Sequence, residues 1–436
     1  MDLKATARQI FADTLAAIDI PAAVERKLAR HGSHIHCDEA TLDLAAFQRI
    51  RVVAYGKASA AMAEGLLRVL APDFGCEGIL VAPAPPASPL PGFRTFVAGH
   101  PVPTAESLAA GRAILELVGG CGEATLLFFL LSGGGSALVE APLDPRVTLE
   151  DIQALNRLLV TCGAPIDEIN SVRKHLSAVK GGRLSAAAPR AMKITLGVSD
   201  VPEGCESALA SGPTLPDPTT VADARAILER YALMPKLPAS IRAIWDEGAV
   251  PETPKPAGTA FQRSHFSLLL GMRDLFHAAH RVAEARGFVT ICDNSTDDWP
   301  LERASSRLLE ILETLARQHP RKSVAVIADG EVSSPVAGDG LGGRNAAFVL
   351  DCAQKISGQR IAVLSAGTDG VDGNSPAAGA VADGETLARA TAAGLDIAAF
   401  ACRSDAYTFF KKLGDAIETG PTGNNLRDLR ILLRQP

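Results

Sequence analysis

The sequence predicts an α/β fold in two domains, and three observations support this prediction. The apolar run at residues 126–131 is too short to cross a membrane and too continuous for a strand with one exposed face, which is typical of a strand buried inside a parallel sheet. Strand-like and helix-like segments alternate on both sides of this run. A chain of 436 residues is also longer than one hydrophobic core usually organises.

The composition is that of a globular protein without a basic surface field. Hydrophobic residues make up 47% and charged residues 21%, and 43 basic against 49 acidic side chains give a net charge of −6. This balance excludes an extended interface with nucleic acid or an anionic membrane, although a local group of Lys and Arg can bind an anionic substrate. Eight cysteines without a C-x-x-C pair indicate neither a zinc ribbon nor a disulfide framework. No segment resembles a signal peptide or reaches transmembrane length, so we expect a cytoplasmic protein.

Histidines follow the first helical segment. Residues 3–30 have the spacing of amphipathic helices, and the stretch HGSHIHC then brings together His31, His34, His36 and Cys37. Metal binding is conceivable for these side chains. The residues that follow are polar and no distant ligand set is evident, so a surface loop is the favoured interpretation.

A lysine follows the first predicted strand. Residues 51–55 have a strand pattern, Gly56 and Lys57 come next, and an alanine-rich helix is expected at 58–70. Lys57 is therefore predicted beside a helix N-terminus. The segment is not a phosphate-binding loop of the Walker A type, because Arg51 occupies the position of its first glycine. The alternative role is a lysine held in a structural salt bridge.

The buried strand at 126–131 ends in a loop without bulky side chains. Backbone N–H groups and two hydroxyls in such a loop can surround an anion. Ligands of open α/β sheets also bind at the carboxyl ends of the strands. The alternative is a tight turn that needs glycine only for its dihedral angles. The loop consists of Ser132, Gly133, Gly134, Gly135 and Ser136.

Basic residues and one carboxylate follow in the first half of the chain. A helix is predicted from about Asp167 to the pair Gly181-Gly182. Its basic residues can clamp an anionic substrate, or they can form a solvated face. A strand at 192–198 then ends beside Asp200. The basic residues are Arg173, Lys174, His175, Lys180 and Arg183.

A proline-rich, weakly hydrophobic stretch at 249–262 marks the expected domain boundary. We therefore expect a first domain at residues 1–250 and a second at residues 262–436. The elements predicted for the second domain are strands at 266–270, 288–291, 323–328 and 360–364, and helices at 272–286, 301–319 and ending near 356.

A glycine-rich segment precedes the last of these helices. Residues 338–343 contain the pattern G-x-G-x-x-G, but the pattern stands apart from its strand and no acidic residue lies about twenty residues beyond it. A dinucleotide site is therefore not favoured. The segment still predicts a helix N-terminus at Gly343, Arg344 and Asn345, where amides, helix dipole and guanidinium can hold a phosphate.

Acidic residues follow the strands of the second half. Glu331 comes after the strand at 323–328. Asp369 and Asp372 lie among glycines after the strand at 360–364, where they can hold a hard cation such as Mg²⁺ or form Asx-turns. Glycine loops, strong cations and carboxylates at strand ends fit phosphoryl transfer, because this reaction depends on positioning and charge neutralisation.

Several motifs in a fixed order resemble the type II glycerate kinase family. They are LLSGGGSAL, INSVRKHLSAVKGGRL, SDVP followed by ASGPTLPDPTT, GGRN, AGTDGVDG and GPTGNNLRDL, and the resemblance runs from about Tyr55 to Leu429. It implies a Rossmann-like N-terminal domain, a smaller α/β C-terminal domain called MOFRL, and an active-site cleft between them. It also implies transfer of phosphate from ATP to the C2 hydroxyl of D-glycerate, with Mg²⁺. The expected partner is this acid or a similar 2-hydroxy acid, and a homodimer is a possible assembly.

The resemblance implies roles for individual residues. Lys57 and Arg344 would be the catalytic cations and face one another across the cleft. Asp200 would orient or deprotonate the hydroxyl group, or bind Mg²⁺, for which Asp369 is the other candidate ligand. The residues expected to bind substrate or nucleotide are Ser132, Gly133, Gly134, Gly135, Ser136, Arg173, Lys174, Glu331, Gly343 and Asn345.

The sequence departs from the family pattern in four loops. Thr104 replaces the aspartate of PVPD, residues 203–205 read EGC where the family has GD, residues 332–335 read VSSP where it has TT, and residues 346–347 read AA where it has QE. Because these loops are expected to line the cleft, the changes affect the prediction of the metal ligands and of the hydroxy acid more than the prediction of the fold. The alternatives are a kinase of a related 2-hydroxy acid or an NAD(P)H hydroxypyruvate reductase, a name given to some bacterial relatives that the missing dinucleotide fingerprint does not favour.

Overall fold

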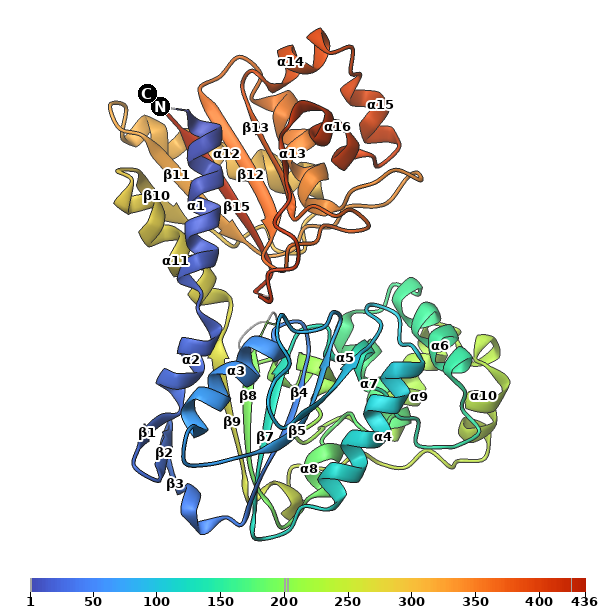
Figure 1. Ribbon diagram of the computed structural model, residues 1–436. Helices are drawn as coiled ribbons and strands as arrows, with labels where there is room; N and C mark the ends of the chain where they lie inside the picture. Colours follow the sequence, from blue (N-terminus) through green and yellow to red (C-terminus); the bar gives the residue numbers. More distant parts are fainter. Residues whose placement is uncertain (1, 200, 202–203, 425) are drawn as a thin grey trace. The chain divides into compact units, whose positions relative to one another are not determined.

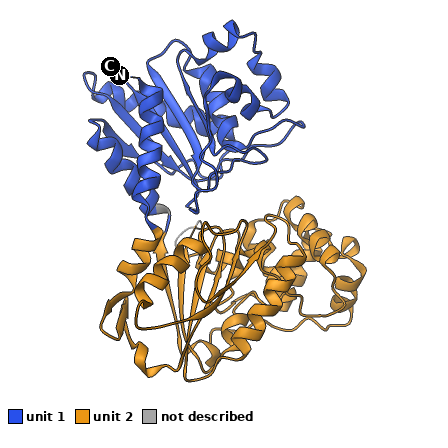
Figure 2. Cartoon of the chain, viewed as in Figure 1, with its two compact units in different colours: residues 1–19, 271–436 blue, residues 20–270 orange. Residues whose placement is uncertain are grey.

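The computed structural model describes residues 2–199, 201, 204–424 and 426–436 (Figure 1). They form two compact units, to which the chain contributes in different ways (Figure 2). Unit 2 is one continuous stretch, residues 20–270. Unit 1 combines residues 1–19 with residues 271–436. The chain therefore begins in unit 1, passes through all of unit 2, and returns to unit 1.

Unit 2 contains a six-stranded parallel sheet with the strand order β6-β5-β4-β7-β8-β9. Counted along the chain, this is the order 3-2-1-4-5-6 of doubly wound nucleotide-binding folds, in which ligands bind where the order reverses. That point lies between β4 and β7. The predicted parallel, Rossmann-like sheet is thus confirmed. Its strands are β4 (Arg49–Tyr55), β5 (Glu77–Ala82), β6 (Phe93–Val97), β7 (Thr125–Ser132), β8 (Met192–Val198) and β9 (Ser264–Leu270).

Helices on both faces bury the central strand β7. Leu127, Phe129 and Leu131 pack with residues of α4 in one apolar cluster. Side chains alternate along a strand, so Phe128 and Leu130 point to the opposite face, where α3 contacts the sheet. Burial of every residue of β7 explains its continuous apolar sequence. The helices of unit 2 are α2 (Ile20–Lys27), α3 (Ser59–Leu70), α4 (Ala105–Gly119), α5 (Gly135–Leu138), α6 (Leu149–Thr161), α7 (Ile166–Leu176), α8 (Arg183–Ala187), α9 (Val221–Arg230) and α10 (Ala239–Asp246), with short 3₁₀ turns at Leu44–Ala46, Glu206–Ser211, Met234–Lys236 and Thr259–Phe261.

A helical layer and a small sheet complete unit 2. Helices α6, α7, α9 and α10 share an apolar cluster that includes the buried Trp245. Strands β1 (Ala29–His31), β2 (His34–Cys37) and β3 (Ala40–Asp43) form an antiparallel sheet. The prediction of a surface loop at HGSHIHC is therefore wrong, because the stretch forms two paired strands. Two residues, Gly32 and Ser33, suffice for a hairpin turn, and Gly32 has the positive φ of +63° that such turns need.

Unit 1 contains a six-stranded mixed sheet with the order β10-β11-β15-β12-β13-β14. The C-terminal strand β15 lies between β11 and β12 and is antiparallel to both. Only β10 and β11 pair in parallel among the described strands of this sheet. The strands are β10 (Val289–Cys292), β11 (Val324–Asp329), β12 (Ile361–Gly367), β13 (Gly379–Asp383), β14 (Ala416–Ile417) and β15 (Asp428–Arg434).

Helix α1 joins the N-terminus to this sheet. It contacts β12, β13, β15 and α11, and the ammonium group of Lys4 donates to Asp415 at 2.9 Å. Both chain ends consequently lie in unit 1, where Figure 1 shows them close together. None of the described helices is long and apolar enough to cross a membrane. The helices of unit 1 are α1 (Leu3–Ala17), α11 (Met272–Ala285), α12 (Leu301–Gln318), α13 (Arg344–Lys355), α14 (Thr386–Ala392), α15 (Ile397–Cys402) and α16 (Ala406–Leu413).

The units differ from the predicted domains at two places, and one helix is shorter than predicted. The first 19 residues belong to unit 1, because α1 packs on that sheet. The strand expected at 266–270 to open the second domain is β9, which pairs with β8 and belongs to unit 2. The helix predicted to continue to Gly181 ends at Leu176, because Ser177 adopts an extended conformation.

We expect Phe129→Ala to lower the free energy of unfolding of unit 2 by about 3–5 kcal/mol, because the ring is fully buried and its loss leaves a cavity. Chemical denaturation followed by circular dichroism measures this change. Val160→Ala on α6 is the control, since Val160 is 60% exposed and its truncation should cost within about 0.5 kcal/mol. Equal costs for the two variants would contradict the buried position of β7.

Candidate active site

Two loops meet where the strand order of unit 2 reverses. Lys57 follows β4 and its backbone N–H donates to the carbonyl of Gly133 at 3.0 Å. The next amide, of Ala58, donates to the hydroxyl of Ser132 at 2.9 Å. Lys57 lies one residue before the N-cap of α3, as predicted. The lysine and the glycine loop thus form one structure at the carboxyl ends of β4 and β7.

The close approach of the two loops requires glycine. A Cβ atom on Gly56 would lie 2.2 Å from the hydroxyl oxygen of Ser132, and Gly56 also has a positive φ of +124°. A Cβ atom on Gly134 would lie 3.5 Å from Cγ of Lys57 and 3.0 Å from the ring of His100. The side chains of Lys57 and His100 therefore converge on Gly134. His100 was not predicted as a site residue, although it stands in the Pro-rich exit of β6.

Hydrogen bonds connect the glycine loop to α7. The hydroxyls of Ser136 and Ser211 are 2.6 Å apart, and Ser211 donates to the amide oxygen of Asn170 at 3.0 Å. Ser211 and the preceding Ala210 have positive φ values of +60° and +49°, which are costly for residues with a Cβ. Sequence reasoning missed Ser211 and Asn170. Their only signal was membership in the motifs ASGPTLPDPTT and INSVRKHLSAVKGGRL.

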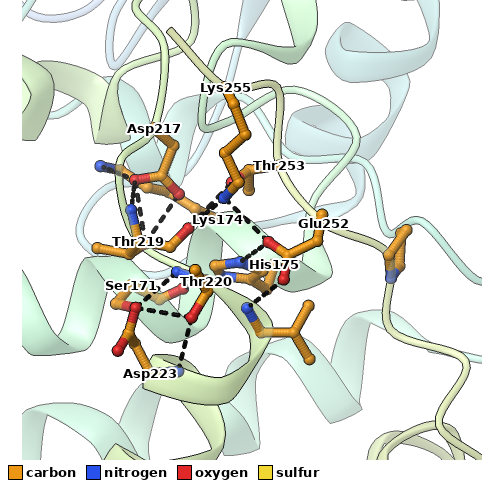
Figure 3. Close-up of polar contacts among 12 residues, drawn as sticks. Ser171, Lys174, His175, Asp217, Thr219, Thr220, Asp223, Glu252, Thr253 and Lys255 are labelled. Carbon is orange, nitrogen blue, oxygen red and sulfur yellow. Dashed lines mark hydrogen bonds and ion pairs between the residues drawn. The ribbon is translucent and has the colours of Figure 1, made fainter. Parts of the chain in front are cut away.

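The predicted basic clamp is divided among separate partners. The ammonium of Lys174 donates to Asp217 at 3.3 Å in a buried ion pair, within the polar network of Figure 3. The guanidinium of Arg173 donates to Asn156 at 2.8 Å. Lys180 pairs with buried Glu140. Binding of a substrate carboxylate by Arg173 and Lys174 stays a prediction.

The network of Figure 3 holds the segments after β8 onto α7. Both oxygens of Asp217 accept from the hydroxyl of Thr219. His175 is fully buried, and its Nδ1 lies 2.8 Å from the carbonyl oxygen of Ser171. Its other ring nitrogen lies 3.7 Å from Glu252. These contacts explain why His175 and Lys174 are buried and why the helix face they occupy is polar.

Asp200, predicted as a catalytic and metal-binding residue, lies outside the described residues. The same holds for Glu203 in one of the four departures from the family pattern. Their predicted roles stay predictions.

The guanidinium of Arg344 is held by two carboxylates at the N-terminus of α13. Its Nε donates to Asp428 at 2.5 Å, and one terminal nitrogen lies 2.7 Å from Glu331. Burial alone lowers the pKa of Arg344, but the charges of Asp428 and Glu331 raise it overall. Asp428 was not predicted and is contributed by β15. Arg344 is therefore oriented by groups from two distant segments.

Asp372 caps α13. Its carboxylate accepts the backbone N–H groups of Asn345 at 3.0 Å and Ala346 at 2.8 Å. A Cβ atom on Gly343 would lie 2.3 Å from this carboxylate, so glycine is needed at the N-cap. Asn345 also accepts from Ser365 at 2.6 Å through its side-chain oxygen. Gly343 and Asn345 thus shape the turn that carries Arg344, and direct ligand binding by them stays a prediction.

The two aspartates after β12 make turn and cap contacts. Asp369 accepts from the backbone N–H of Val371 at 3.0 Å, which is the Asx-turn considered for it. Burial raises the pKa of the Asp372 carboxyl to about 6, against the lowering effect of its two backbone donors. The local geometry therefore accounts for both residues, and a metal-binding role for Asp369 stays a prediction.

A second group of charges lies at the end of β11. Arg427 donates to both oxygens of Asp297 at 2.7 Å. The guanidinium of Arg430 is fully buried and donates to the backbone carbonyl of Gly330 at 2.8 Å. Burial, together with the nearby Asp297, raises the pKa of the Asp329 carboxyl to about 6 against the opposing charges of Arg427 and Arg430. Sequence reasoning identified only the strand end.

The glycines of the G-x-G-x-x-G pattern serve chain packing. Cβ atoms on Gly338 and Gly340 would each lie 2.6 Å from the carbonyl oxygen of Arg403. The third glycine of the pattern, Gly343, is the N-cap described above, and a Cβ atom on the intervening Gly342 would lie 3.2 Å from the backbone nitrogen of Tyr407. These contacts with residues 403–407 give Gly338, Gly340 and Gly342 a role in chain packing.

Comparisons with known proteins cover nearly the whole chain. Residues 6–246 match DUF4147, a domain of unknown function, and residues 324–428 match the MOFRL family. The chain is 36% identical over 394 residues to a D-glycerate 2-kinase of Thermotoga maritima. The aligned region covers 90% of this chain and 92% of that protein. It is 39% identical over 391 residues to a putative hydroxypyruvate reductase of Agrobacterium vitis, covering 88% and 87%. The crystal structure of glycerate kinase from Thermotoga maritima superposes with a TM-score of 0.83 at 34% identity, covering 99% of both chains.

We expect Gly56→Ala to destabilise unit 2 by about 1–3 kcal/mol, because the new methyl group has no space beside Ser132. Gly75→Ala is the control, since nothing lies within 4 Å of a Cβ atom at that position. Denaturant unfolding of both variants measures the difference. A Gly56→Ala variant as stable as Gly75→Ala would show that the two loops are not held together as described.

We expect the Asp329→Asn variant to gain stability relative to the wild type as pH rises. The folded-state pKa of about 6 lies above the unfolded value, so ionisation of Asp329 costs folding free energy as pH rises from about 4 to about 6. The amide cannot ionise, and the difference in free energy of unfolding should shift toward the variant by about 1–3 kcal/mol between pH 4 and pH 7. Exposed Asp339→Asn is the control. The same difference at both pH values would contradict a raised pKa.

Proposed function

The chain belongs to the type II glycerate kinase family, in which a DUF4147 domain precedes a MOFRL domain, and we propose on this premise that it transfers the γ-phosphoryl group of ATP to the 2-hydroxyl group of D-glycerate. The observation that carries the proposal is the joined pair of loops at the point where the strand order of unit 2 reverses. A lysine and a bare glycine loop at such a point suit an anionic ligand. Glycerate and the phosphates of ATP are both anionic.

Lys57 has the chemistry to offset charge on the transferring phosphoryl group. It follows β4 directly, and its backbone is bonded to Gly133, so the side chain starts from a rigid position. The loop from Ser132 to Ser136 offers backbone amides to a phosphate or to the substrate carboxylate. Phosphoryl transfer is accelerated mainly by such positioning and charge stabilisation, with little covalent help from the protein.

Arg344 is proposed as the second catalytic cation. Its two carboxylate partners fix the plane of the guanidinium, which prepares its remaining N–H groups for a bidentate contact with phosphate oxygens. Lys57 belongs to unit 2 and Arg344 to unit 1, and each is proposed to contact the transferring phosphoryl group. Arg173 and Lys174 are proposed for the substrate carboxylate, and Asp200 is proposed to orient or deprotonate the 2-hydroxyl.

Mg²⁺ is proposed to arrive with ATP, since it is usually bound by one or two carboxylates and the substrate phosphates. The described residues fit this mode. Among them, a group of three converging His, Cys, Asp or Glu ligand atoms occurs only at Cys37, Asp38 and His265, which is not a hard-oxygen site. Asp369 offers one carboxylate at the end of β12. The ion would neutralise phosphate charge, and the proton of the attacking hydroxyl would pass to a carboxylate, for which Asp200 is proposed.

A reductase is the second candidate, because one relative carries the name of a putative hydroxypyruvate reductase. The sequence of the turn after β4 does not favour a reductase. There the chain reads Gly56-Lys57-Ala58, without the three glycines that bring a dinucleotide pyrophosphate onto the following helix.

The test is an assay with ATP, Mg²⁺ and D-glycerate, in which ADP release is followed and the product is identified by ³¹P NMR. We expect 2-phosphoglycerate. Lys57→Ala and Arg344→Ala should each lower kcat by about 10³-fold or more, if their contribution equals that of other phosphate-stabilising cations. Lys322→Ala and Arg321→Ala remove exposed cations at other positions and are the matched controls.

Each other outcome contradicts a defined part of the proposal. 3-Phosphoglycerate as product would refute the attack by the 2-hydroxyl. Activity only with another 2-hydroxy acid in a substrate panel would refute glycerate as the substrate. NADH oxidation with hydroxypyruvate, in place of ADP release, would favour the reductase. Unfolding curves of the two site variants must match the wild type, because Arg344→Ala leaves Asp428 without its partner.

A further inference from the structure

Three histidines lie on one face of the small antiparallel sheet of unit 2. The register pairs His31 of β1 with His34 of β2, and directly opposed residues project from the same face. His36 follows His34 by two positions and shares that face. Ile35 and Cys37 point to the opposite face and are each 1% exposed. The imidazoles therefore gather on the side turned away from the core.

The imidazoles lie near one another, and their ligand atoms all come within 4.8 Å of one another only after rotation of side chains. The ring centres of His31 and His36 are 5.8 Å apart, and two imidazoles bound to the same ion at Zn–N distances of about 2.0–2.1 Å have ring centres about 5 Å apart. Nδ1 of His36 lies 2.9 Å from the hydroxyl of Thr41, and Nδ1 of His34 lies 3.3 Å from the hydroxyl of Ser33. Metal-binding histidines commonly use one ring nitrogen for such a contact and the other for the ion. Nε2 is thus the nitrogen that His34 and His36 can offer.

A carboxylate stands beside the histidines. Asp43 of β3 is directly opposite His34, so it projects from the same face. Its Oδ1 accepts the backbone N–H of Ala45 at 3.1 Å. The carboxylate is therefore held on the histidine face of the small sheet.

We propose that His31, His34 and His36 bind one divalent transition-metal ion, such as Zn²⁺, with Asp43 as the fourth ligand. Two histidines at positions i and i+2 of one strand and a third on the neighbouring strand are held at their backbones by the sheet, so binding requires only rotation of side chains. Three imidazoles and a carboxylate are ligands that suit Zn²⁺, Ni²⁺ or Cu²⁺. The ion would connect β1, β2 and β3. Because β3 leads into the amino end of β4, the site lies at the end of unit 2 away from Lys57 (Figure 1).

A neighbouring cluster is the competing location for an ion. Ligand atoms of Cys37, Asp38 and His265 converge within 4.8 Å. Both oxygens of Asp38 already have partners, namely Lys27 at 2.5 Å on one side and Ser267 at 2.5 Å on the other. An ion at this cluster would have to displace these two partners of Asp38.

The first experiment titrates the metal-free full-length protein with Zn²⁺ in competition with a chromophoric chelator. We expect one ion per chain. His34→Ala and His36→Ala should each weaken binding by about 100-fold or more, since loss of even an indirect partner of a ligand costs 10–100-fold. His319→Ala removes a histidine from unit 1, and His265→Ala removes one from the competing cluster. Both controls should bind as the wild type does. Circular dichroism establishes that each variant is folded.

The second experiment replaces Zn²⁺ by Co²⁺ and records the absorption spectrum. Nitrogen and oxygen ligands give only weak bands in the visible range, whereas a bound thiolate adds an intense charge-transfer band in the near ultraviolet. The proposal predicts the absence of this band, and its appearance would place the ion at Cys37. Loss of binding in His265→Ala, unchanged binding in the triple variant lacking His31, His34 and His36, or no stoichiometric binding by the wild type would each overturn the proposal.

Discussion

The backbone hydrogen bond from the N–H of Lys57 to the carbonyl of Gly133 is the contact on which the site of unit 2 depends. It joins two turns whose strands are neighbours in the sheet but 70 residues apart in the chain, and it is possible only because Gly56 leaves room for Ser132. The parallel sheet determines where the turns meet. The hydrogen bonds through Ser136 and Ser211 then extend this rigid region to α7.

Unit 1 positions its cation by a different principle. Arg344 stands at a helix N-terminus that is capped from outside by Asp372, and its guanidinium is held by carboxylates from the ends of β11 and β15. Burying several charges is costly unless each is paired, and the bidentate pair of Asp297 and Arg427 meets that need beside Asp329. The dense pairing therefore keeps one arginine in a defined orientation while leaving carboxyl groups with raised pKa values.

Local patterns in the sequence were sufficient to predict those elements that have a characteristic run of neighbouring residues. The apolar run of β7, the Gly-Lys turn before α3 and the glycine-lined start of α13 were predicted at their observed positions. The contacts of α1 and β15 were not predictable, because the partners of α1 begin only at residue 272 and β15 pairs with strands at 324–329 and 361–367. The same reason explains why four site residues were not predicted, because each contacts the site through a segment that is distant in the chain. They are His100, Asn170, Ser211 and Asp428. The histidine-rich stretch could not be interpreted from the sequence for a related reason. Only the registers of β1, β2 and β3 show which of its side chains project from the same face of the sheet.

The placement of α1 and β15 in the same unit has a consequence for biosynthesis. The strand β15 comes last in the order of strands, and it lies between β11 and β12 and pairs with both. During translation, unit 2 has its whole sequence available long before this strand is made. Unit 2 can therefore fold while α1 still lacks its sheet, and unit 1 can close only after β15 has been synthesised. A chain that stops before β15 would consist of a folded unit 2 attached to an open sheet with exposed edges, which quality-control proteases can recognise.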